Sequence, residues 1–96
     1  MTLLKYCVVG DLEGVKQALN NGDNVNEIDQ EVLRTTPLIL AVRNGHKEIV
    51  RMLLDHPRLF LTARDACGDT ALHHSVRGGN EDITRMIIER NFFCKV

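Results

Sequence analysis

The feature that most constrains this chain is a pattern of residues that returns after about 34 positions, since 70 − 36 = 34 separates its two clearest copies. The first of these copies is the stretch Thr36–Leu54, TPLILAVRNGHKEIVRMLL. Thr36 suits a helix N-cap, and Pro37 suits the first helical position because its missing N–H has no partner there. Gly45 suits the turn that ends one helix and starts another. The stretch therefore predicts two short helices joined by a tight turn.

The same pattern begins again at Thr70. The residues that match Thr36, Leu38, Val42, Arg43 and Gly45 are Thr70, Leu72, Val76, Arg77 and Gly79. A weaker copy lies upstream, where Gly10 matches Gly45 at an offset of 45 − 10 = 35. The sequence therefore predicts three helix pairs in succession.

A period of about 33 residues with the motif Thr-Pro-Leu-His-x-Ala is typical of ankyrin repeats. The motif appears as Thr36-Pro-Leu-Ile-Leu-Ala41 and as Thr70-Ala-Leu-His-His-Ser75. The chain resembles the ankyrin-repeat family over nearly its whole length. This resemblance implies an all-α solenoid of stacked helix-turn-helix pairs joined by β-hairpin-like loops. We expect one domain, 1–96, with repeats at about 1–34, 35–68 and 69–96.

The outer copies differ from the central one at positions where neighbouring repeats pack. The central Leu40 and Ala41 are replaced by Lys5 and Tyr6 in the first copy, and by His74 and Ser75 in the third. Terminal repeats need a polar outer face, so both outer copies resemble capping repeats. The alternative, that the chain is part of a longer repeat array, stays open.

One loop departs from the family's pattern. The first finger, Gln30–Thr35, is about two residues longer than usual and lacks the expected glycine before Thr36. The last outer helix is expected to span about Glu81–Arg90, after which Asn91–Val96 should begin another hairpin turn. The tail is expected to fold back over the last helix. Alternatively, the Phe60/Phe93 side forms an apolar surface through which copies self-associate.

Composition narrows the class of partner and the compartment. A net charge of −1 argues against nucleic acid, which requires a basic surface. No apolar run is long enough to cross a bilayer, and the N-terminus has no basic leader typical of a signal peptide. Three cysteines at irregular spacing do not form a disulfide framework. We therefore expect an intracellular protein, cytoplasmic or nuclear.

Histidine and cysteine residues are the candidates for a metal site or a catalytic nucleophile, and their pattern gives weak support to either. By the resemblance, His73 braces the hairpin through hydrogen bonds. Cys67, His73 and His74 form the rival metal site, but their spacing lacks the paired ligands typical of zinc. No phosphate-binding glycine loop and no oriented nucleophile–base pair is evident. We expect no metal, no cofactor and no enzymatic activity, with Cys7 in the core and Cys67 on an exposed loop.

The function favoured by these observations is non-catalytic binding of another protein on the concave face that stacked repeats form. By resemblance, the contact residues are finger tips and the ends of inner helices: Val8, Val9, Glu31, Val32, Leu33, Arg34, Arg43, Asn44, Ala66, Cys67, Asp69 and Arg77. Arg43 and Arg77 share a register and are predicted to form a basic ladder for an acidic partner segment. The alternative is that both are solvated helix-end charges. The partner's identity stays open, and the chain is expected to be a monomer or weak homodimer.

Overall fold

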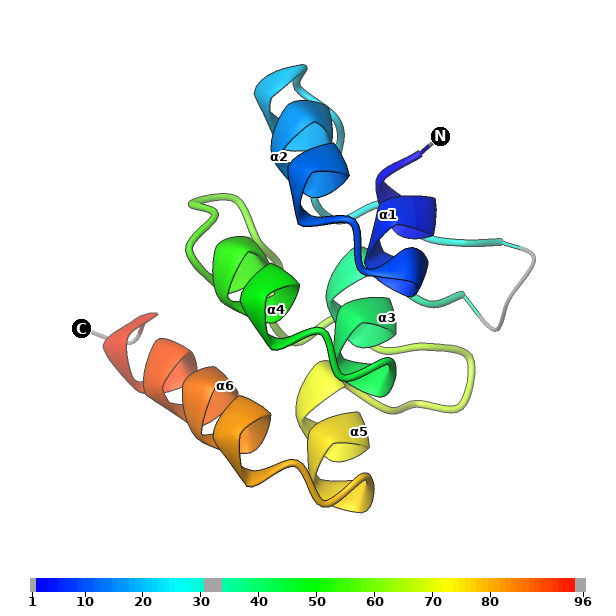
Figure 1. The fold of residues 1–96 in the computed structure, drawn as a ribbon. Helices are drawn as coiled ribbons and strands as arrows, with labels where there is room; N and C mark the ends of the chain where they lie inside the picture. Colours follow the sequence, from blue (N-terminus) through cyan, green and yellow to red (C-terminus); the bar gives the residue numbers. More distant parts are fainter. Residues whose placement is uncertain (1, 31–33, 95–96) are drawn as a thin grey trace.

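The computed structural model describes the backbone of residues 2–30 and 34–94, and side chains in those ranges as far as Arg90. Within these residues the chain forms six α-helices in stacked pairs (Figure 1). They are α1 Leu3–Val9, α2 Leu12–Asn20, α3 Pro37–Arg43, α4 Lys47–Leu54, α5 Ala71–Arg77 and α6 Glu81–Cys94. The predicted all-α architecture is confirmed.

The helices form two layers. The inner helices α1, α3 and α5 lie side by side, and the outer helices α2, α4 and α6 form the second row (Figure 1). The loops that follow α2 and α4 extend beyond the inner row as fingers before the chain returns to the next inner helix (Figure 1). Neighbouring pairs thus pack against each other, and α3–α4 is covered on both sides.

Side chains define where the helices begin. The hydroxyl of Thr36 accepts a hydrogen bond from the N–H of Ile39 at 3.3 Å, and the carboxylate of Asp11 accepts one from Gly14 at 3.0 Å. Such caps satisfy backbone N–H groups that have no partner within the helix. The N-cap predicted at Thr36 is confirmed, and Thr2, Asp11 and Asn80 cap α1, α2 and α6 in the same way.

Glycine makes each turn within a pair. Gly10, Gly45 and Gly79 have φ angles of 82°, 71° and 71°. A side chain strains this left-handed conformation, so glycine is the residue that allows the two helices of a pair to lie close together.

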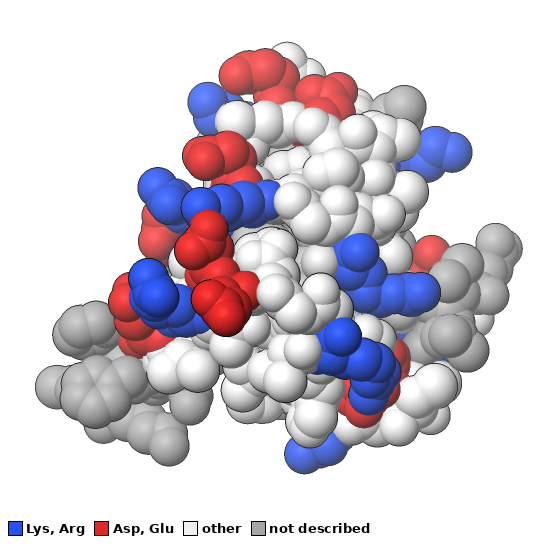
Figure 2. Space-filling model, turned by 60° about the horizontal axis from the view of Figure 1, so that its bottom comes forward, with Lys and Arg blue, Asp and Glu red and all other residues white. Residues whose placement is uncertain are grey.

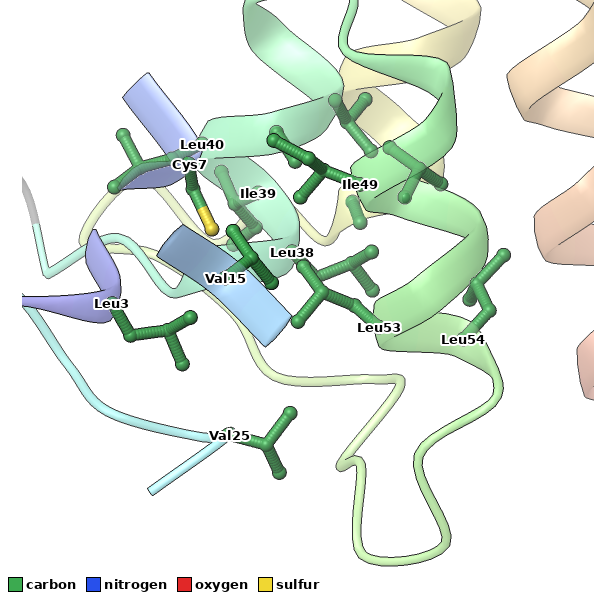
Figure 3. Close-up of a cluster of buried hydrophobic side chains, with 14 of the residues drawn as sticks. Leu3, Cys7, Val15, Val25, Leu38, Ile39, Leu40, Ile49, Leu53 and Leu54 are labelled. Carbon is green, nitrogen blue, oxygen red and sulfur yellow. The ribbon is translucent and has the colours of Figure 1, made fainter. Parts of the chain in front are cut away.

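The core between the layers is aliphatic. Val15, Val50, Leu53 and Ile83 have no exposed surface, and Cys7 is equally buried. Figure 3 shows buried side chains of the first two pairs directed into the space between the helices. The prediction that Cys7 is a core residue is confirmed.

The last helix is longer than expected. α6 continues to Cys94, four residues beyond the predicted end at Arg90, so the expectation of a hairpin turn is wrong for Asn91–Cys94. The reason is visible one repeat earlier, where α4 ends before His56-Pro57. Proline cannot continue a helix, whereas its counterpart Asn91 can. The backbone to Cys94 does not fold back over α6, and the side chains of Phe92 and Phe93 lie outside the described residues.

Candidate functional site

The ends of the inner helices form a row of exposed side chains. Val8, Arg43 and Arg77 occupy the same register position in α1, α3 and α5. All three are exposed, and so is Val9 beside Val8, with 53% of its surface accessible. The row therefore changes from apolar at the first pair to cationic at the second and third.

The cationic side chains of this row differ in how they are paired. The Nη1 of Arg77 donates to Oδ2 of Asp69 at 3.0 Å, and this hydrogen bond holds the pKa of the Asp69 carboxyl below its ordinary value. The Arg43 side chain forms no hydrogen bond or ion pair with the described residues. The basic ladder expected from sequence thus contains one uncompensated guanidinium.

Asn44, at the end of α3, already has a structural role. Its side-chain Nδ2 donates to the carbonyl of Leu40 at 2.8 Å, and the same carbonyl also accepts the backbone N–H of Asn44 at 3.1 Å. The Asn44 side chain remains exposed next to Arg43.

A buried carboxylate organises the second finger. Oδ1 of Asp65 accepts hydrogen bonds from the backbone N–H groups of Cys67 at 2.9 Å and Asp69 at 3.0 Å. Its Oδ2 lies 2.8 Å from Nε2 of His74 on α5. Burial raises the pKa of Asp65, but the hydrogen bonds from His74 and the two N–H groups outweigh it, so this pKa lies below its ordinary value.

This network places the residues predicted on the second finger tip. Ala66 and Cys67 are exposed at the tip, and Asp69 is half-buried at its base, paired with Arg77. Sequence reasoning missed the roles of Asp65 and His74. The signal was an aspartate at the start of both fingers, Asp29 and Asp65, each donating its N–H across the base of its finger.

The first finger has a strained base. Asp29 donates its N–H to the carbonyl of Thr35 at 2.8 Å, and Asp65 makes the equivalent bond to Asp69. These closing pairs are 35 − 29 = 6 and 69 − 65 = 4 positions apart, so the predicted two-residue extension is confirmed. Arg34, exposed in the described part of this finger, has φ 55° where the second finger has Gly68. Glu31, Val32 and Leu33 lie outside the described residues.

The structure does not group Cys67, His73 and His74 as the metal-site hypothesis required. Nδ1 of His73 accepts the N–H of Thr70 at 3.1 Å, which completes the cap of α5 and confirms the bracing role implied by the resemblance. His74 instead meets Asp65 and Asp69, with ligand atoms within 4.8 Å of one another. A cation there would displace His74 from Asp65 and compete with Arg77 for Asp69. This set of residues is better explained as a hydrogen-bonded brace.

The two cysteines whose side chains are described lie in different surroundings. Burial raises the pKa of the Cys7 thiol to about 12, which keeps it protonated. Cys67 is exposed on the finger, as predicted.

Charge on the rest of the molecule is mixed. Figure 2 shows basic and acidic side chains alternating along one side, with uncharged surface between them and a second group of basic side chains. Among the described residues, no helix has both the length and the apolar character needed to cross a bilayer.

Comparison with known proteins agrees with this geometry. A family model described as ankyrin repeats, in three copies, matches residues 3–96. The chain is 44% identical over 59 residues to the human transient receptor potential cation channel subfamily A member 1. These 59 residues are 62% of this chain and 5% of the channel protein. It is 33% identical over 78 residues to mouse Rabankyrin-5, covering 81% of this chain and 6% of that protein.

The match to a fission yeast protein includes a larger share of this chain and a larger share of the relative than the two matches above. BTB/POZ domain-containing protein 3 of Schizosaccharomyces pombe is 33% identical over 90 residues, which are 92% of this chain and 16% of the yeast protein. The chain thus spans less than a fifth of the length of each of these relatives.

Proposed function

The chain belongs to the ankyrin-repeat family, whose repeats are a general protein-interaction module, and on this premise we propose that it holds a partner protein on its concave face. Ankyrin repeat domains are typically non-catalytic, and the proposed activity is binding alone. The surface consists of the finger tips and the exposed ends of α1, α3 and α5.

The observation that carries the proposal is the row Val8–Arg43–Arg77 at the inner helix ends. These side chains are exposed, and Arg43 lacks a partner among the described residues. Arginine is enriched among the residues that dominate binding energy at protein interfaces. We infer that the partner presents an acidic side chain to Arg43 and an apolar one to Val8 and Val9.

Arg34 supports the same surface from the finger. Its left-handed backbone conformation destabilises the fold, because a side chain at this φ is strained. Strain of this kind clusters at sites under functional constraint, which motivates the hypothesis that the arginine side chain is retained for binding.

Affinity capture from source cells tests the proposal. We expect Arg43→Glu to reduce recovery of the specific partner by about tenfold or more, the size typical of a central interface residue. Arg51→Glu is the matched control, because it makes the same charge change on the exposed surface of α4, in the outer row. Equal recovery by both variants would contradict the assignment of the surface.

Self-association is the second candidate function, and the exposure of Phe60, at 61%, favours it. Exposed aromatic side chains are enriched at interfaces between proteins. Sedimentation at increasing concentration tests this alternative with Phe60→Ser as the comparison. A wild-type chain that stays monomeric throughout contradicts it.

A further inference from the structure

The two arginines at the inner helix ends differ because of the residue that stands eight positions before each of them, since 77 − 69 = 8 and 43 − 35 = 8. Before Arg77 this residue is Asp69, whose Oδ2 accepts a hydrogen bond from Nη1 of Arg77 at 3.0 Å. Before Arg43 it is Thr35, which is buried and carries no charge. A single difference between the two repeats thus leaves Arg43 uncompensated by the described residues and supplies Arg77 with a counter-ion.

The base of the second finger holds Asp69 in place. Its backbone N–H donates to Oδ1 of Asp65 at 3.0 Å, and its carbonyl accepts the N–H of Asp65 at 2.9 Å. Asp65 is itself anchored to α5, because its Oδ2 lies 2.8 Å from Nε2 of His74. The Asp69 side chain is only 19% exposed, so its carboxylate is fixed against the end of α5 before any partner arrives.

The surroundings of Arg77 oppose a further negative charge. The carboxylates of Asp65 and Asp69 lie with their ligand oxygens within 4.8 Å of each other, beside His74. An acidic side chain brought to Arg77 therefore meets two carboxylates, and like charges across an interface disfavour binding. The Arg77 side chain is nevertheless 63% exposed, and a guanidinium has five N–H donors. This position thus suits a neutral hydrogen-bond acceptor.

The row presents three different positions at regular steps. The inner helices lie side by side in the same orientation (Figure 1), and packed helices are about 8–10 Å apart. The first position is apolar, at Val8 with Val9 beside it, the second is cationic at Arg43, and the third is the compensated Arg77. One step corresponds to about three residues of an extended segment or about six of a helix.

We propose that the concave face selects a partner segment with one acidic side chain at Arg43, an apolar side chain at Val8 and a neutral side chain at Arg77. The inference rests on the proposed function and deepens it, because it states the charge that the partner carries at each position. Asp69 is the specificity-determining residue, since it prevents Arg77 from attracting a second acidic group. A segment that is acidic at both positions has no advantage over one that is acidic at Arg43 alone.

A display library of random linear peptides tests the proposal without a known partner. Peptides enriched on the wild-type chain should share an acidic residue about one step from an apolar residue, with a neutral residue one step further on. Peptides enriched on Asp69→Asn should carry a second acidic residue at that last position. Enrichment of the same charge pattern on both chains would overturn the proposal.

Fluorescence anisotropy then measures the effect with two synthetic peptides, copied from the most enriched wild-type sequence and differing only in Gln or Glu at the third position. Asp69→Asn should bind the Glu peptide about two- to fivefold more tightly than the Gln peptide, as expected for a new exposed ion pair. The wild-type chain should show no such preference. Adding Arg77→Gln to Asp69→Asn should abolish it, and a preference that survives this change would contradict the assignment to Arg77.

Asp82→Asn is the matched control, because it removes the same charge from the exposed pair with Lys47, away from the inner row. It should bind both peptides as the wild-type chain does, and a preference for the Glu peptide would reduce the effect to net charge. Asp69→Asn should fold normally, because both of its bonds to Asp65 come from the backbone. Circular dichroism checks this.

Arg43→Gln separates this inference from the proposed function. It should weaken binding of both peptides about tenfold or more, as expected for a central interface residue. If no peptide enriched on the wild-type chain requires Arg43, the proposed surface and this inference both fail. Binding that requires Arg43 but has the same charge preference in the wild-type chain and Asp69→Asn would overturn this inference alone.

Discussion

The first and the last helix pair each have one face that no other described pair covers, and the two faces differ in their side chains. At the first pair, the ring of Tyr6 lies over Gly14, where a Cβ atom would be only 2.2 Å from Tyr6 Cδ1. The ring takes the space that the matching Ile49 and Ile83 side chains fill in later pairs. At the last pair, Val76 and Ile88 keep the apolar character of an interior repeat. Closing an end thus depends on replacing the packing residues themselves.

Polar residues on α5 and α6 do not remove the apolar character of the last face. Ser75 donates to the carbonyl of Leu72 at 2.8 Å, and the Thr84 hydroxyl lies 2.9 Å from that of Ser75. These hydroxyls satisfy one another within the pair. Val76 and Ile88 beside them remain exposed, so the third pair combines features of an end repeat and an interior one.

The largest expected effect comes from introducing the same charge at a covered and at an open position. Val42→Asp should destabilise the fold by about 3–5 kcal/mol or prevent folding, because an unpaired carboxylate would be buried. Val76→Asp, at the matching exposed position, should change stability by less than about 0.5 kcal/mol. Urea unfolding measures both, and similar losses would contradict the distinction between covered and open faces.

A second prediction tests how Tyr6 closes the first pair. Gly14→Ala should destabilise the chain by about 1–3 kcal/mol, because the added methyl overlaps the Tyr6 ring. In a double-mutant cycle, Tyr6→Ala should relieve much of that loss, with a coupling of about 0.5–3 kcal/mol.

The control for this cycle is Gly78→Ala, since a Cβ atom there would lie 3.3 Å from the nearest atom and Tyr6 is not involved. Thermal unfolding of the single and double variants gives the coupling. Additive effects of Gly14→Ala and Tyr6→Ala would show that the ring does not fill this space.

A third prediction concerns the brace that joins the second finger to α5. Asp65→Asn should destabilise the chain by about 1–3 kcal/mol, because the buried site loses charge-assisted hydrogen bonds. The pKa of Asp65 is lowered in the folded state, so its contribution is complete above the unfolded pKa of about 3.9 and is lost as pH falls through the lower folded pKa.

Urea unfolding between pH 3 and 7 checks this sign. The wild-type chain should lose stability below about pH 4, and Asp65→Asn should lose less over the same interval. Asp82→Asn is the comparison, because its pair with Lys47 is exposed and should contribute less. An unchanged pH profile in Asp65→Asn would exclude the brace.

The smallest expected effect compares the two finger bases. Arg34→Gly should stabilise the chain by about 0.5–1 kcal/mol, because glycine adopts φ 55° without a steric penalty. Gly68→Ala should destabilise it by a similar amount. Thermal unfolding decides, and a loss of stability in Arg34→Gly would show that the arginine side chain supports the fold.

Much of the fold could be predicted because the repeat is local. Caps such as Thr36 and turns such as Gly45 depend on short-range backbone requirements, which residue identity reveals directly. The length of α6 could not be predicted with the same ease, because its end depends on the absence of a proline at Asn91. Alignment with His56-Pro57 predicted a turn at Asn91, but Asn91 itself does not end a helix as proline does.

The candidate site was less predictable because its chemistry depends on pairings between elements. Arg43 and Arg77 look equivalent in sequence, yet only Arg77 has Asp69 within reach. His74 looks like a surface residue of an end repeat until Asp65 is placed beside it. The spacing of the repeats predicts the register of such residues. It does not predict which residues of other loops pair with their charges.

Hydrogen exchange at individual amides, followed by NMR, tests most directly the claim that stability resides in the covered central pair. The slowest exchange should occur in α3 and α4, with faster exchange in α6, whose outer face is open. Slowest exchange in α6 of the free chain, or uniform exchange across all helices, would contradict the account.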